Sequence, residues 1–222
     1  PLTIGDFDND GFVDIYIGFP GIRDFTSGIS NRTRPDWLSS QGIWFNKGSW
    51  TFNEATEANG VVTDNGIYAH AAVATDIDAD GKIDLLVVDD SGRINPMYKN
   101  LGNGRFEESS EKMKIQEGGL SMGLTTGDFN NDGLQDIMST NITLTAGERI
   151  ANSSAGMLEP SSKMSKVTDK LRKSYKSLQL YSNNGDGSFT EVTEGAGVGW
   201  AGDAAAAGEW IDYNHDGFLD YY

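Results

Sequence analysis

One nine-residue pattern, D-x-[DN]-x-D-G-x-x-D, occurs four times in this chain and constrains its fold more than any other feature. The copies occupy residues 6–14, 76–84, 128–136 and 212–220. An apolar run of strand type follows the pattern, as in residues 85–88. A local motif that recurs between strands indicates an array of similar β units.

The spacing of the motif supplies the oxygen ligands that calcium prefers. Positions 1, 3 and 5 offer carboxylate or amide oxygens, position 7 a backbone carbonyl, and position 9 a carboxylate that could bind with both oxygens. Glycine at position 6 permits the sharp turn that brings these groups together. The predicted ligands are Asp6, Asp8, Asp10, Phe12 and Asp14; Asp76, Asp78, Asp80, Lys82 and Asp84; Asp128, Asn130, Asp132, Leu134 and Asp136; and Asp212, Asn214, Asp216, Phe218 and Asp220.

Other readings of the motif fit less well. Asp, Asn and Gly also form ordinary turns, but four copies of the same nine-residue pattern favour a metal-binding loop. Magnesium demands stricter octahedral geometry, and zinc prefers nitrogen and sulfur ligands, whereas the chain has no Cys and two His. An EF-hand needs Glu at position 12 and flanking helices, but position 12 is here Ile17, Val87 or Ser139 and the following runs are of strand type. The sequence therefore predicts about four calcium ions, one in each loop.

A second element recurs between the acidic motifs. It reads aromatic-x-Asn, a Gly-rich turn, then Phe-x-Glu-x-Ser/Thr, and it occupies residues 44–56, 98–110 and 181–193. Such turns between alternating runs predict hairpins. Together the two elements give four strands in each unit, so we expect an all-β fold of four-stranded β-propeller blades, with three full units and part of a fourth in residues 1–222.

Two longer segments interrupt the repeats, at about 18–41 and 141–177. The second has apolar residues at helical spacing between lysines and arginines, and predicts one amphipathic helix that begins near residues 161–162. The helix could pack its apolar stripe on the domain, or could contact an acidic partner or an anionic membrane surface. We treat 1–222 as a single domain that is expected to be incomplete.

Charge and composition narrow the classes of partner. The net charge is −16, and the four motifs hold 14 of the 33 acidic residues. Four calcium ions would reduce this charge to −8. Such acidity argues against a nucleic-acid partner, which requires a basic face. No apolar stretch is long enough for a transmembrane helix, which needs roughly 20 residues. Calcium loops of modest affinity favour a location outside the cytosol: extracellular, on the cell surface or periplasmic.

The acidic loop, together with residues 180–198, resembles the FG-GAP/VCBS repeats of integrin-α-like β-propellers. The nearest type is the secreted one that often ends in an ASPIC/UnbV module, which is not found in this sequence. The resemblance covers nearly the whole chain apart from the two inserts. It implies a propeller of about seven blades, with calcium bound between the first two strands of a blade.

Three hypotheses for function follow. The favoured one is a calcium-stabilised interaction or adhesion scaffold that binds a protein or carbohydrate through its inserted loops. A second is a non-catalytic subunit of a larger assembly. A third is a polysaccharide-active, lyase-like enzyme, which is disfavoured because nothing in the sequence places a base beside a charge stabiliser. His215 lies inside a loop, and His70 is expected to be a satisfied core or channel residue.

Overall fold

The computed structural model describes residues 1–18, 41–55, 59–61, 69–90, 94–115, 121–142, 177–199 and 205–222. The two predicted inserts, including the helix within 141–177, lie almost wholly outside these ranges. Every strand pairing among the described residues is antiparallel. The all-β prediction is therefore confirmed.

Within the described ranges, the strands form three four-stranded sheets and one two-stranded sheet, each in sequence order. Blade 1 contains β1 (Leu2–Gly5), β2 (Asp14–Gly18), β3 (Gln41–Asn46) and β4 (Phe52–Ala55). Blade 2 contains β5 (Ala69–Thr75), β6 (Asp84–Asp89), β7 (Met97–Gly102) and β8 (Arg105–Glu108). Blade 3 contains β9 (Ser121–Gly127), β10 (Asp136–Asn141), β11 (Leu178–Asn183) and β12 (Phe189–Glu191), and blade 4 contains β13 (Trp210–Ile211) and β14 (Asp220–Tyr221).

The two sequence repeats take the places predicted for them. The acidic motifs, here named loops 1 to 4 in chain order, join the first strand of each blade to the second. Position 9 starts the second strand and pairs with the residue before the loop, as Thr75 pairs with Asp84. The Gly-rich turns join the third strand to the fourth in blades 1 to 3.

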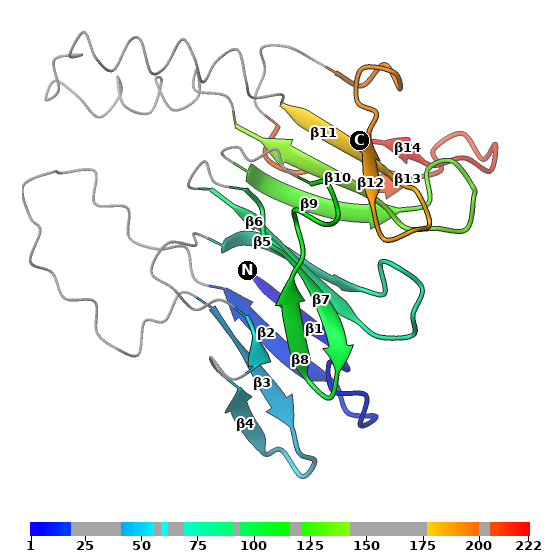
Figure 1. Ribbon diagram of the computed structural model, residues 1–222. Helices are drawn as coiled ribbons and strands as arrows, with labels where there is room; N and C mark the ends of the chain where they lie inside the picture. Colours follow the sequence, from blue (N-terminus) through cyan, green and yellow to red (C-terminus); the bar gives the residue numbers. More distant parts are fainter. Residues whose placement is uncertain are drawn as a thin grey trace, which may run out of the picture.

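Successive blades stack face to face (Figure 1). Their first strands are neighbours, since β1 contacts β5, β5 contacts β9 and β9 contacts β13. This arrangement, with the first strand of each blade next to the first strand of the following blade, is that of a β-propeller. The predicted propeller of four-stranded blades is therefore observed.

The hydrophobic core lies between the blades, in two clusters of buried side chains. One cluster joins blade 1 to blade 2 and includes Phe7, Tyr16, Ile43, Leu85 and Tyr98. The other joins blade 2 to blade 3 and includes Ile77, Leu86, Met97, Ile137 and Tyr181. Position 2 of an acidic loop is thus a core residue in loops 1 and 2, where Phe7 and Ile77 are at most 1% exposed. The loops are consequently anchored to the core by their own side chains.

Candidate calcium sites

All four acidic loops fold in the same way around the carboxylate at position 1. In loop 2, Asp76 accepts the backbone N–H of Asp80 at 3.0 Å and that of Gly81 at 2.9 Å. The equivalent pairs of bonds occur at Asp6, Asp128 and Asp212. The N–H of position 7 binds the position-5 carboxylate in each loop, as Lys82 N–H binds Asp80 at 3.0 Å. The loop backbone is therefore shaped by its own acidic side chains.

Two backbone positions in each loop have left-handed φ. Gly81 at position 6 has φ +82°, and a Cβ built there would meet no atom within 4 Å, so conformation and not space requires glycine. Position 4 is also left-handed, with φ 59° at Ala79 and 62° at His215. The sequence reasoning missed position 4, although Asn at that place in loops 1 and 3 is a recognisable signal, since Asn tolerates this region.

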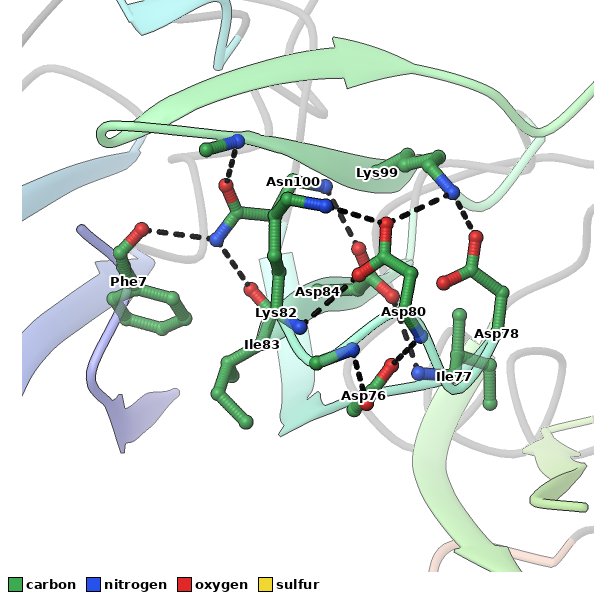
Figure 2. A network of polar contacts seen from close by, with 12 residues as sticks. Phe7, Asp76, Ile77, Asp78, Asp80, Lys82, Ile83, Asp84, Lys99 and Asn100 are labelled. Carbon is green, nitrogen blue, oxygen red and sulfur yellow. Dashed lines mark hydrogen bonds and ion pairs between the residues drawn. The ribbon is translucent and has the colours of Figure 1, made fainter. Parts of the chain in front are cut away.

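Position 9 has a second role that the motif alone does not reveal. Asp84 accepts the backbone N–H of Ile77 at 3.1 Å with one oxygen and that of Asn100 at 2.7 Å with the other (Figure 2). Asp14 and Asp136 make the same two kinds of bond in blades 1 and 3. The second donor is always the Asn of the aromatic-x-Asn element. The two sequence repeats therefore meet at this carboxylate.

Loops 1 and 2 gather carboxylates into groups that suit a divalent cation. Ligand oxygens of Asp6, Asp8 and Asp14 lie within 4.8 Å of one another, and so do those of Asp76, Asp78 and Asp84. Within these groups, Oδ1 of Asp8 and Oδ1 of Asp78 are buried and have no hydrogen-bond partner. Since a buried acceptor without a partner is costly, a cation would satisfy both. The residues fit calcium, a hard ion that takes oxygen ligands.

Loops 3 and 4 have Asn at position 3 and one charge fewer. Asn130 donates its amide to Asp132 at 2.8 Å, and Asn214 donates to Asp216 at 2.9 Å. The two loops differ at position 9, because Asp136 is fully buried whereas Asp220 is exposed. All twenty predicted ligand residues thus lie in the loops, but their coordination of an ion remains a prediction.

Lysines from the loops and from the hairpins also reach the acidic groups. Lys47 lies 2.8 Å from Asp8 and 3.6 Å from Asp10. Lys99 pairs with Asp78 and lies 3.4 Å from Asp80, which also pairs with Lys82. These ion pairs were not predicted from the sequence, although Lys47 and Lys99 each adjoin the Asn of the hairpin element. In blade 3 the residues on either side of Asn183 are Ser and Asn, so loop 3 has no equivalent lysine there.

Burial raises the pKa of the position-9 carboxyls in loops 1, 2 and 3. Desolvation raises the pKa of Asp84 to about 6, and the nearby Asp80 and Asp76 carboxylates add to the effect. The same causes raise the pKa of Asp136 to about 6. Burial also raises the pKa of Asp14 above its ordinary value. A bound cation would counter both causes, because it offsets desolvation and neutralises the neighbouring charges.

Neither histidine forms an acid–base pair with another described residue. His215 occupies position 4 of loop 4 and is exposed. His70 was expected to be a satisfied core or channel residue: its Nδ1 lies 3.0 Å from the carbonyl oxygen of Met122, and the side chain is exposed, which excludes the core alternative and leaves the channel one a prediction.

A groove of about 570 Å³ runs between blades 2 and 3 beside loop 2. Its lining is mostly polar and includes Asp78, Lys99, Glu107, Lys112 and Asp186. Asp186 accepts hydrogen bonds from Ser188, which hold the pKa of this exposed carboxyl below its ordinary value.

In the described part of the chain, no helix is both long and apolar enough to span a bilayer.

Comparison with known proteins agrees with this geometry. The FG-GAP-like repeat family matches residues 76–139 and 168–222, which include loops 2, 3 and 4. No curated protein sequence matches the chain. A solved structure is similar over the whole chain, with a TM-score of 0.47 and 16% identity; its title describes specific recognition of non-reducing terminal N-acetylglucosamine by an Agrocybe aegerita lectin. The chain spans 46% of the length of that lectin. Because the FG-GAP-like repeat model matches more than half of its residues, the chain belongs to the FG-GAP-like repeat family.

Proposed function

We propose that this chain is a non-catalytic propeller scaffold whose four acidic loops each hold one structural calcium ion. The observation that carries the proposal is the pair of buried, unpartnered oxygens of Asp8 and Asp78. Asp8 and Asp78 each belong to a group of three carboxylates whose ligand oxygens lie within 4.8 Å of one another. Without an ion these groups repel one another, so calcium would stabilise the loop and with it the junction of the first two strands.

The scaffold would act outside the cytosol, where calcium is abundant enough to fill sites of modest affinity. Recognition would take place on exposed segments presented by the rigid blades, because loops on a fixed framework commonly carry binding residues. The inserts predicted at about 18–41 and 141–177 are the candidate contact segments for a protein or carbohydrate ligand. The same surfaces would serve if the chain is one subunit of a larger assembly.

Thermal unfolding in about 2 mM calcium and in chelator tests the proposal, together with elemental analysis of the bound metal. A ligand that binds only the folded state raises the melting temperature by mass action. We expect close to four calcium ions in each chain and a melting temperature that falls sharply in chelator. A chain that binds no calcium and melts identically under both conditions would refute the proposed role of the loops.

A double variant, Asp8→Ala with Asp78→Ala, assigns the effect to particular loops. It removes the position-3 oxygen ligand from loops 1 and 2, so we expect it to lose calcium at these loops and much of the calcium-dependent rise in melting temperature. Glu107→Ala is the matched control, because Glu107 is an exposed acid that pairs with Lys112 and lies outside every loop. The control should keep the full calcium response.

A further inference from the structure

Two asparagines link neighbouring blades: Asn100 joins loop 2 to loop 1, and Asn183 joins loop 3 to loop 2. The side-chain amide of Asn100 donates to the carbonyl of Ile83 in its own loop at 2.9 Å and to the carbonyl of Phe7 in loop 1, also at 2.9 Å (Figure 2). Asn183 repeats this in blade 3, with bonds to Gln135 at 3.0 Å and to Ile77 in loop 2 at 2.8 Å. The cross-blade acceptor is position 2 of the preceding loop in both cases.

These bonds are part of a continuous series that runs through three loops. The N–H of Phe7 binds Asp14, and the carbonyl of Phe7 accepts from Asn100, whose own N–H binds Asp84. The series continues from Asp84 through Ile77 to Asn183, and then to Asp136. The series thus repeats three groups in order: the carboxylate at position 9, which is a predicted calcium ligand, the backbone of position 2, and the asparagine of the next blade.

The series lies in the interior of the protein. Asn100 and Asp84 are fully buried, Phe7 is also fully buried, and Asn183 is 4% exposed. Water cannot replace a bond that is lost there, so each donor and acceptor depends on its protein partner. Displacement of one residue in the series therefore has a cost at the next.

We infer that calcium binding at successive loops is positively coupled through Asn100 and Asn183, an inference that rests on the proposed calcium function. An ion in loop 1 fixes Asp14 and, through it, the backbone of Phe7. That backbone orients the Asn100 side chain, which holds the N–H that binds Asp84 of loop 2. Loop 2 is then already partly ordered before the second ion binds, so less free energy is spent on ordering it and its calcium affinity rises.

Asn46 of blade 1 provides a matched control within the same chain. It makes the same bonds inside its own blade: its N–H to Asp14 at 2.8 Å, its side-chain amide to the carbonyl of Val13 at 3.1 Å, and its side-chain oxygen to the N–H of Gly48 at 2.9 Å. Within the described residues it has no bond to another loop. Asn46→Leu therefore damages a blade as Asn100→Leu does, without cutting a link between loops.

The position-6 glycines allow each loop to be observed separately. The N–H groups of Gly11, Gly81, Gly133 and Gly217 bind the position-1 carboxylate of their own loop, so their NMR signals report its occupancy. A chain with ¹⁵N-labelled glycine is titrated with calcium, with loop 1 either intact or disabled by Asp8→Ala and Asp10→Ala. Asp14 is retained, so that the hydrogen-bond series stays in place.

Disabling loop 1 should raise the calcium concentration at the midpoint of the Gly81 response by roughly five-fold or more, the usual lower range of coupling between sites. In a chain that carries Asn100→Leu, disabling loop 1 should leave the Gly81 midpoint unchanged. In a chain that carries Asn46→Leu, disabling loop 1 should still shift the Gly81 midpoint. In the calcium-free protein, Asn100→Leu should also speed hydrogen exchange of the backbone N–H at position 100, which binds Asp84. A Gly81 midpoint that ignores loop 1, or that shifts equally in the Asn100→Leu chain, overturns the coupling.

The experiment separates this inference from the proposed function. Independent calcium responses at the four glycines would reject the coupling and leave the calcium sites standing. Glycine signals that do not respond to calcium would reject both. If Asn100→Leu fails to fold, Asn183→Leu repeats the test one blade further on, with loop 2 disabled by Asp78→Ala and Asp80→Ala and with Gly133 as the reporter.

Discussion

The ammonium nitrogen of Lys47 lies 2.8 Å from Asp8 Oδ2, inside the group of acids that loop 1 presents to a cation. Lys99 takes the corresponding place at Asp78 in loop 2. Each lysine comes from the hairpin of the same blade and neutralises part of the charge at positions 3 and 5. In the calcium-free protein, a lysine thus neutralises part of the negative charge of loop 1 and of loop 2. Calcium must therefore compete with the lysine ammonium group for these carboxylates.

Replacing Lys99 with Met should strengthen calcium binding at loop 2 and weaken the calcium-free protein. The substitution keeps much of the aliphatic length but removes the charge that competes with the ion. A partly exposed ion pair contributes roughly 0.2–1 kcal/mol, so the calcium affinity should rise by up to about five-fold and the calcium-free stability should fall by a similar free energy. Calorimetric titration and urea unfolding in the absence of calcium measure the two effects.

Lys112→Met is the control for this prediction. Lys112 pairs with Glu107 at 2.7 Å on the surface and contacts no loop carboxylate. It should leave both calcium affinity and calcium-free stability nearly unchanged. Unaltered affinity in Lys99→Met would show that the ammonium does not compete with the ion.

Ala79→Asn should stabilise loop 2. Ala79 has φ 59°, a left-handed conformation that is unfavourable for Ala and better tolerated by Asn, the residue at this position in loops 1 and 3. The expected gain is up to about 1 kcal/mol in the free energy of unfolding, measured by urea denaturation. Asn9→Ala, the reverse exchange in loop 1, should have the opposite sign, and two changes of the same sign would contradict the argument.

Gly104→Ala should destabilise the protein more than Gly81→Ala does. Both glycines have left-handed φ, +68° and +82°, so both substitutions carry conformational strain of roughly 1–2 kcal/mol. Only at Gly104 would the new methyl group also collide, because its carbon would lie 2.3 Å from Cζ of Phe45 in the preceding blade. Equal losses of unfolding free energy would show that Phe45 moves aside at little cost.

The calcium-free protein should lose stability as the pH rises from about 4 to about 6. The folded-state pKa values of Asp84 and Asp136 are about 6, above the ordinary value of 3.8, so the folded state holds these protons more tightly than the unfolded state. The resulting stabilisation is complete below the unfolded-state pKa and disappears as the pH passes the folded-state pKa.

Calcium should reverse this trend, because the ion requires the ionised carboxylate and must displace the proton. Urea unfolding of metal-free protein and of calcium-saturated protein across this range gives the two slopes. Asp84→Asn combined with Asp136→Asn should flatten the metal-free slope. A slope that survives in that double variant would assign the titration to other groups.

The sequence predicted the local architecture correctly. Four acidic loops, three hairpins and four strands in each complete unit follow from turn chemistry and from alternating apolar residues, which act between neighbours along the chain. The calcium ligands at positions 1, 3, 5, 7 and 9, the two inserts and the binding role were also predicted from sequence, and they stay predictions. Among the residues that the structure describes, the carboxylates at positions 1, 3 and 9 converge in loops 1 and 2.

Tertiary structure alone decided how the repeats are joined. Nothing near Asn183 in the sequence indicates that its amide would bind the carbonyl of Ile77, 106 residues earlier. Likewise, the Lys99 ion pair forms only once the strands of blade 2 have assembled, and the burial that raises the pKa of Asp84 arises only in the folded structure. Backbone turns are set by the preferences of adjacent residues, whereas hydrogen bonds between blades and desolvation depend on which surfaces the packed core brings together.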